Sequence, residues 1–210
     1  ILLGCAGSPS DDGAAPPTPP LAASPQVTST AAPAASAGDV IAAAQAFRAG
    51  VELSTQGRNT EAVAAYRRAV AQTPSYVEAY YNLGNALARQ LNIPEAIEAY
   101  ERVLGLDSTH VSARHNLAAL YVKQLNYAQA IAEHEAVMRL APRHVATYYD
   151  LGFIYFIRGE YERVEELLQT GRRLAPRDAR FHRLLGRMRQ KQLRYDEAVK
   201  VLEEAVALHS

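Results

Sequence analysis

Tryptophan is absent from this chain, and cysteine occurs only once, at position 5. A single cysteine cannot form a disulfide within the chain, and it leaves no cluster of Cys and His of the kind that binds zinc. Neither sign of charge is in excess, because 22 lysines and arginines balance 22 aspartates and glutamates. Overall charge therefore predicts no nucleic-acid partner. Alanine dominates the 49% of residues that are hydrophobic, which favours a core of small, close contacts between helices.

A period of 34 residues runs through the chain from residue 43 without a gap. In the second block, apolar residues stand at helical spacing both before and after Pro94, which predicts two antiparallel helices. Small residues recur at the eighth and twentieth positions of the blocks, where the two helices must touch. The blocks are 43–76, 77–110, 111–144, 145–178 and 179–210, and the small residues are Gly50, Gly84, Ala118, Gly152 and Gly186, then Ala62, Ala96, Ala130 and Ala198.

This pattern resembles the tetratricopeptide repeat, and the resemblance covers the chain after residue 38. It implies an all-α fold, a right-handed superhelical solenoid of five helix-turn-helix repeats, in a domain spanning residues 39–210. Asp39 is expected to be the N-cap of the first helix, because its carboxylate can accept unpaired amides. The fourth repeat departs from the pattern, since Val164 stands at a crossing position and Gly171 lies inside the second helix. We expect that helix to be displaced or less stable.

The residues before the repeats have a different composition. The run Leu2-Leu3-Gly4-Cys5 resembles the lipobox of bacterial lipoproteins, which implies that residues 1–4 are the end of a signal peptide and that Cys5 is acylated, for instance with palmitate. The alternative is an ordinary apolar N-terminus with an incidental cysteine. Residues 5–38 hold seven of the eleven prolines, which predicts a disordered linker of roughly 30 Å. Ala6 after the cysteine resembles an outer-membrane address, so we expect a lipid-anchored protein facing the periplasm.

The repeats show no catalytic pattern. The pairs Glu165-Glu166 and Glu203-Glu204 are adjacent, so their carboxylates point in different directions on a helix and cannot act as opposed acid and base. The six histidines lack the i, i+4 spacing of a helical metal site, and we expect them to be solvated or to lie between repeats. The sequence thus predicts a protein that is not an enzyme and that needs neither a metal nor a cofactor.

In tetratricopeptide proteins, a concave groove is lined by the first helix of each pair. The resemblance implies that this groove binds a protein segment. Asn82 and Asn116, one repeat apart, are similar to the asparagine ladder that holds a peptide backbone in several family members, and family drift is the alternative. The candidate partner-binding residues are Tyr81, Asn82, Asn85, His115, Asn116, Tyr149, Asp150, Phe153, Phe156, Arg183 and Arg187.

Two parts of this candidate groove have competing interpretations. The rings of Tyr149, Phe153 and Phe156 exceed what packing of one helix requires, which favours an exposed binding patch, although they could instead be core or contact another subunit. Residues 172–194 contain nine basic residues and one acidic residue. This stretch either attracts an acidic partner or anionic envelope components, or is simply a solvated helix face.

Near residue 210, we expect Val201, Leu202 and Leu208 to be partly uncovered, which predicts self-association, a partner, or further residues beyond this sequence. The chain also resembles the tetratricopeptide lipoproteins that act as pilotins or assembly factors for type IV pili and secretin pores. That resemblance implies a lipid-anchored adaptor that holds a segment of an envelope assembly. The alternatives are a structural accessory subunit of a large membrane-associated complex and a regulatory module of a separate enzyme.

Overall fold

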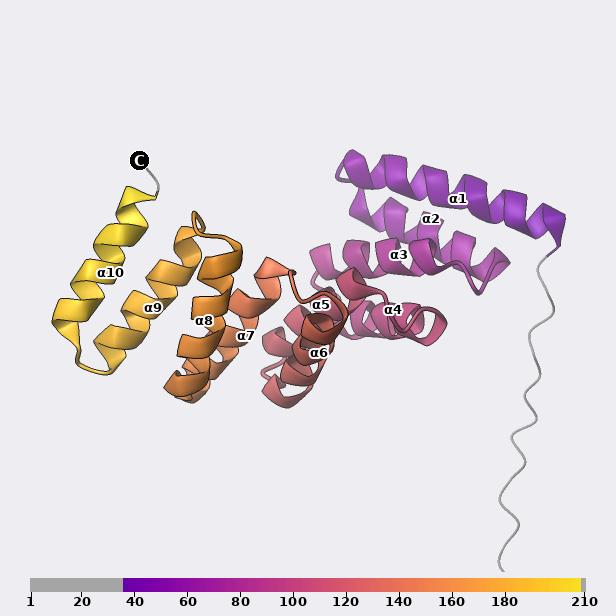
Figure 1. The fold of residues 1–210 in the computed structure, drawn as a ribbon. Helices are drawn as coiled ribbons and strands as arrows, with labels where there is room; N and C mark the ends of the chain where they lie inside the picture. The colour runs from indigo at the N-terminus through magenta and orange to yellow at the C-terminus, as the bar shows by residue number, and fades with distance from the viewer. Residues whose placement is uncertain (1–35, 209–210) are drawn as a thin grey trace, which may run out of the picture. The chain divides into compact units, whose positions relative to one another are not determined.

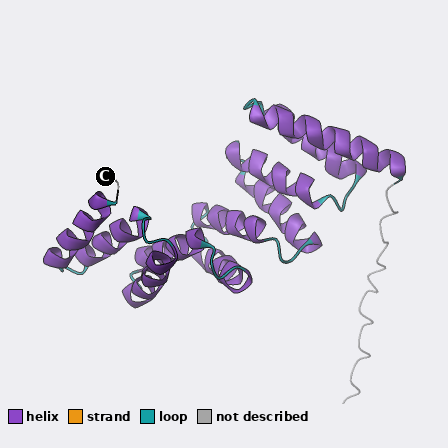
Figure 2. Cartoon of the chain, turned by 45° about the horizontal axis from the view of Figure 1, so that its top comes forward, coloured by secondary structure: helices purple, strands orange, loops and turns teal. Residues whose placement is uncertain are grey.

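The computed structural model describes residues 36–208, so Cys5 and most of the predicted linker lie outside the described part of the chain. Within that part, ten helices form five successive hairpins, and Figure 2 shows only short loops between them. The helices, labelled in Figure 1, are α1 (Ala37–Thr55), α2 (Asn59–Gln72), α3 (Val77–Arg89), α4 (Ile93–Leu106), α5 (Val111–Lys123), α6 (Tyr127–Leu140), α7 (Val145–Arg158), α8 (Tyr161–Leu174), α9 (Ala179–Lys191) and α10 (Tyr195–Ala207).

The helix boundaries follow the 34-residue period. Helices α3, α5, α7 and α9 each begin at the first residue of a predicted block. The two helices of each hairpin pack together, and the second helix of a hairpin packs against the first helix of the next. The all-α solenoid of five helix-turn-helix repeats is therefore confirmed. None of the described helices combines the length and the apolar character that a membrane crossing requires.

The first helix begins three residues earlier than predicted, inside the expected linker. Ser36 is its N-cap: the Ser36 hydroxyl accepts a hydrogen bond from the Asp39 N–H at 3.2 Å, and the Asp39 carboxylate accepts one from the Ser36 N–H at 2.9 Å. This reciprocal pair is a capping box, which satisfies two amides at once. Asp39 is thus the third residue of the helix and not its cap, because a serine three residues upstream completes the box.

Small residues do stand where the two helices of a hairpin touch. A Cβ at Gly84 would lie 2.7 Å from the Tyr100 ring, so glycine lets this ring of α4 lie directly on α3. In the fourth repeat, a Cβ at Gly171 would lie 2.1 Å from the ring of Phe181, which belongs to the next hairpin. Helix α8 is unbroken and has the same length as α4 and α6. Gly171 is therefore a packing requirement, not a defect that displaces the helix.

The turn inside each hairpin contains one left-handed residue at the fifteenth position of the repeat. Glycine fills this position in the first and fourth repeats, as Gly57 and Gly159. Leucine fills it in the other three, with φ of 61° at Leu91, 59° at Leu125 and 61° at Leu193. A side chain in this conformation crowds the backbone and costs roughly 1 kcal/mol or more. The side chains of these leucines are exposed.

The apolar core is divided between the third and fourth repeats. One cluster of buried side chains runs through the first three repeats and includes Tyr66, Tyr100 and Leu117. The other fills the last two repeats around Leu168 and Phe181. Ile154 of α7 belongs to the first cluster, so the two clusters adjoin there. The boundary between them lies at α5, α6 and α7.

Candidate partner-binding face

Hydrogen bonds between side chains join the second and third repeats on the predicted groove side. The Tyr100 hydroxyl donates to Asn85 Oδ1 at 2.7 Å, and Asn116 Nδ2 donates to the same oxygen at 3.0 Å. Asn116 Nδ2 also lies 3.3 Å from the Tyr100 hydroxyl and 3.5 Å from that of Tyr81. Burial raises the pKa of Tyr100 to about 12, so its hydroxyl stays protonated and can donate. The network fixes the orientation of both amides.

Asn116 pairs with Asn85 and not with Asn82. The Asn82 amide donates to the Glu78 carbonyl of its own helix at 2.8 Å. Because Glu78 is four residues earlier on the same helix, this bond competes with any contact across to α5. Asn85 stands one helical turn after Asn82, and it is the residue whose amide meets the next repeat. Both asparagines were among the predicted groove residues, but the link between repeats uses the second one.

The amides of Asn85 and Asn116 line a hollow with a volume of about 440 Å³ on α3, α4 and α5. Two cations stand among its lining residues: Arg89, whose guanidinium donates to Ser54 Oγ at 2.8 Å, and the exposed Lys123. The name amide hollow is used below for Tyr81, Asn85, Arg89, Tyr100, Asn116 and Lys123. Its groups can donate to and accept from a peptide backbone, and its cations favour a negative charge nearby.

The predicted aromatic patch on α7 is half-buried, so both interpretations of it are partly right. The rings of Tyr149 and Phe153 are stacked, with centroids 6.5 Å apart and planes 12° apart. Tyr149 also meets the edge of Phe181 at 6.0 Å, and all three rings of the patch, including Phe156, pack against the second apolar core. One part of each ring thus supports the core while the remainder is accessible.

Arginines of α9 lie over these rings. The guanidinium of Arg180 is 5.2 Å from the Tyr149 ring centre, and that of Arg187 is 5.5 Å from the Phe156 ring centre. These distances are within the range of a cation–π interaction. The aromatic patch and the basic end predicted as two features are therefore one surface. We call it the ring–arginine face, and its members are Tyr149, Phe153 and Phe156 of α7 with Arg180, Arg183 and Arg187 of α9.

Two other basic residues of the 172–194 stretch, Arg172 and Arg189, are neutralised by acidic side chains away from this face. The buried Arg189 forms ion pairs with Glu165 and with Glu197, the latter at 3.5 Å. Arg172 pairs with Glu204 at 3.3 Å. These pairs connect α8, α9 and α10 and support the fold. Arg172 and Arg189 thus support packing, whereas Arg180, Arg183 and Arg187 lie on the ring–arginine face.

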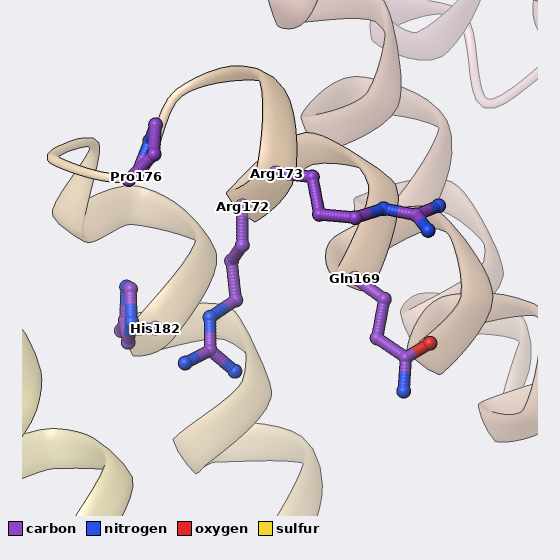
Figure 3. A pocket seen from close by; sticks show the side chains of 5 residues that line it. All are labelled: Gln169, Arg172, Arg173, Pro176 and His182. Atoms are coloured by element: carbon purple, nitrogen blue, oxygen red, sulfur yellow. The ribbon is translucent and has the colours of Figure 1, made fainter.

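A second hollow, of about 370 Å³, opens between α8 and α9 and is shown in Figure 3. Gln169, Arg172, Arg173, Pro176 and His182 line it, and Arg172 extends between His182 and Gln169. Burial lowers the pKa of His182, so its ring is neutral near pH 7. Because Arg172 is already held by Glu204, its charge is compensated inside the protein. We assign this hollow a structural role.

Three histidines meet between the third and fourth repeats, a cluster that their sequence spacing did not indicate. The ring centre of His115 lies 5.6 Å from that of His134 and 4.9 Å from that of His144. His115 Nε2 is 3.6 Å from Asp150 Oδ2, and the His144 ring bonds the buried Thr147 hydroxyl at 2.7 Å. Within residues 36–208, no three potential ligands are placed to hold a metal ion.

Burial controls the charge of this histidine cluster. It lowers the pKa of His134 to about 3 and also lowers that of His115, and repulsion from neighbouring histidines acts in the same direction. Burial raises the pKa of Asp150 to about 6, against the attraction of Arg180. His115 and His134 are therefore neutral at pH 7. The sequence could have indicated that His134 is buried. It stands at the repeat position where the other repeats have an inward-facing tyrosine or leucine.

The last hairpin exposes apolar surface, though not all of the predicted residues carry it. Val201, Leu202 and Leu208 are each half-buried, and Val201 packs against the second core. Among the aliphatic residues of α10 that are exposed are Val199 and Val206, at 55% and 72%. They line a hollow of about 530 Å³ together with Leu202, Glu203 and Ala207.

Comparison with known proteins identifies the repeats. Tetratricopeptide-repeat models match residues 50–90, 77–110 and 122–188. No curated protein matches the chain at a significant level of sequence similarity. Among solved structures, residues 41 to the end of MamA from Desulfovibrio magneticus RS-1 are 24% identical, with a TM-score of 0.75 over 80% of this chain and 94% of that one.

Two further structures share the fold. YrrB, described as a TPR protein with an unusual peptide-binding site, is 18% identical, with a TM-score of 0.68 over 79% of this chain and 86% of that one. PilF of Pseudomonas aeruginosa is also 18% identical, with a TM-score of 0.69 over 81% of this chain and 78% of that one. The repeat models, which together match residues 50–110 and 122–188, show that the chain belongs to the tetratricopeptide-repeat family, and the five hairpins and these likenesses in fold agree with them.

Proposed function

We propose that this protein is a lipid-anchored adaptor that binds an extended segment of a partner protein and helps to assemble or stabilise an envelope complex of the pilus or secretin type. One observation carries the proposal: apart from Tyr100 of α4, the residues of the amide hollow and of the ring–arginine face all lie on first helices of successive repeats. The likeness in fold to YrrB supports the binding of a protein segment, since that protein is described by its peptide-binding site.

The amide hollow suits the backbone of such a segment. Within the described residues, the hydrogen bonds leave the Asn85 amide N–H groups and the Asn116 side-chain oxygen without partners. One can donate to a carbonyl of an extended chain and the other can accept from its N–H, so the pair recognises backbone without selecting a sequence. Selectivity would then come from the ring–arginine face, where aromatic rings and guanidinium groups offer apolar and ionic contacts.

Acylation of Cys5 would tie this binding domain to the membrane. The linker of residues 5–38 would let the domain reach a partner about 30 Å away. An outer-membrane location facing the periplasm follows from the resemblance of the N-terminal residues to a lipoprotein sorting signal. Replacing Cys5 by serine should release the protein from the membrane fraction without changing its helical content, because the described helices do not include Cys5. Unchanged membrane association would contradict the lipid anchor.

A second candidate is a structural accessory subunit of a membrane-associated complex. The exposed Val199 and Val206 of α10 favour it, because an apolar strip of this kind can be buried against another subunit or a second copy of this chain. In that case the main contact would use α10 and leave the ring–arginine face free.

Site-specific photocrosslinking in the native cell separates the two candidates. A benzophenone amino acid is introduced at Phe153 for the ring–arginine face, at Tyr81 for the amide hollow, at Val206 for α10, and at the exposed Ala132 of α6 as the matched control. The adaptor predicts one partner crosslinked from Phe153 and Tyr81 and absent with Ala132. A product from Val206 alone would favour the accessory subunit, and equal products from all four positions would refute a specific face.

A further inference from the structure

The cations of α9 form a row along one side of the helix. Arg180, Arg183, Arg187 and Lys191 are separated by three, four and four residues, a spacing that keeps them on the same face. Residues 179–191 contain no aspartate or glutamate. The row therefore has no acidic neighbour along its own helix, and any compensating charge must come from another element or another molecule.

The structure compensates only part of this row. Arg180 pairs with Asp178 at 2.7 Å. Within residues 36–208, Arg187 contacts the Phe156 ring. Lys191 has no acidic partner among these residues. Arg189 of the same helix differs from the row, because its guanidinium points to the opposite side of the helix and is bound by two glutamates. The fold thus neutralises the buried side of α9 and leaves positive charge on the ring–arginine face.

The rings hold these guanidinium groups in place. Arg180 and Arg187 lie over Tyr149 and Phe156, which are themselves fixed by packing against the second core. An arginine whose side chain is already ordered loses less entropy when it binds a ligand, and its planar group matches a carboxylate with two parallel hydrogen bonds. Phe153 lies beside Tyr149 on the same helix and adds apolar surface.

The dimensions of the row fit an extended chain. Residues four apart on a helix are separated by about 6 Å along its axis. Alternate residues of an extended chain, which point to the same side, are separated by about 6.7 Å. In a segment lying between α7 and α9, one set of alternate side chains would face the cations of α9 and the other set would face the rings of α7.

We infer that the segment recognised by the ring–arginine face is an extended peptide in which acidic residues alternate with apolar ones. The inference rests on the proposed function, because it names the chemistry of the segment that the adaptor binds. A protein segment is favoured over an anionic bilayer because the cations form a single row with Asp150 and Asp178 close by, and these carboxylates would oppose a broad negative surface.

Three fluorescein-labelled eight-residue peptides test the inference by fluorescence anisotropy with the 210-residue chain. One alternates glutamate and leucine, the second has four glutamates followed by four leucines, and the third alternates lysine and leucine. We expect the alternating acidic peptide to bind at least tenfold more tightly than either of the others. Equal binding of the first two would overturn the alternation, and preference for the lysine peptide would overturn the charge.

Matched variants locate the binding. Arg187→Glu should weaken the alternating acidic peptide at least tenfold, whereas Arg139→Glu, the same charge change on the exposed side of α6, should change the affinity less than twofold. Equal effects of the two variants would mean general attraction and would overturn the assignment. Phe156→Leu keeps the residue apolar but removes the ring that orders Arg187, so it should weaken binding severalfold. Its melting temperature serves as a check on folding.

Two further outcomes separate this inference from neighbouring ones. The first uses vesicles of one part phosphatidylglycerol to three parts phosphatidylcholine. If the protein sediments with these vesicles, if Arg187→Glu abolishes this sedimentation, and if the alternating peptide does not bind, the face belongs to the membrane and the inference is overturned. If a partner is still crosslinked from Phe153 while the alternating peptide does not bind, the acidic chemistry is wrong and the adaptor function stands.

Discussion

Replacing His134 by leucine should make the protein less sensitive to acid. The His134 ring is 1% exposed, and burial, with repulsion from His115 and His144, lowers its pKa from 6.5 to about 3. Leucine occupies the equivalent position as Leu168 and Leu202 in the next two repeats, so the hairpin can accommodate it. The variant therefore removes a titrating group while it keeps an inward-facing apolar side chain.

The sign of the effect follows from where the proton binds. Below pH 6.5 the unfolded chain protonates His134 while the folded protein keeps the ring neutral, so unfolding takes up a proton. The stability that depends on the neutral ring is complete above this pH and is lost as the pH falls toward 3. Each pKa unit is equivalent to about 1.4 kcal/mol, so acidification from pH 7 to pH 5 should lower the free energy of unfolding by about 2 kcal/mol through His134 alone.

Urea unfolding followed by circular dichroism at pH 7 and pH 5 measures this loss in both proteins. The wild type should lose about 2 kcal/mol more than His134→Leu between the two pH values. Asp150, whose raised pKa of about 6 acts in the opposite direction, is present in both proteins and largely cancels in the difference. An equal loss in the two proteins would show that His134 is accessible to protons in the folded state and would refute the reasoning.

Three further changes test the packing. Leu125→Gly should raise the free energy of unfolding by about 1 kcal/mol in urea titrations, because it relieves a left-handed leucine whose side chain is exposed; a destabilised variant would show that the leucine has a packing role. Gly171→Ala should lower the melting temperature by several degrees, because the new methyl group meets the Phe181 ring; an unchanged value would contradict the tight contact. Tyr100→Phe should cost about 1 kcal/mol, because it removes one of the two hydrogen bonds to the Asn85 oxygen, and a change in helical content would count against a local effect.

The sequence alone predicted the repeat boundaries well because each depends on local pattern. The period places the starts of α3, α5, α7 and α9, and the eighth-position glycines predict where the helices meet. These features require only that apolar and small residues recur at helical spacing. The start of α1 was less accurate, since Ser36 and Asp39 cap the helix jointly and the composition of the preceding residues obscured the serine.

The candidate site was predicted less completely because it depends on contacts between repeats. Asn82 and Asn85 both stand on α3, and only the geometry shows that Asn82 bonds its own helix while Asn85 meets Asn116. Similarly, Arg187 and Arg189 are two residues apart, yet one lies over a ring and the other is held by glutamates. Pattern analysis assigns residues to helix faces, whereas the division of charge between packing and binding requires the positions of side chains on neighbouring helices.

The division of the apolar core between the third and fourth repeats has a consequence for folding. In a linear array, each repeat gains stability from its own hairpin and from the surfaces it shares with its neighbours, so cooperativity passes along the chain only as strongly as each shared surface allows. Here one of those surfaces contains the rings of His115, His134 and His144 beside the apolar side chains of Ile131 and Ile154. We therefore expect the last two repeats to open while the first three remain folded, so that amide exchange in α9 and α10 would report partial and not global unfolding.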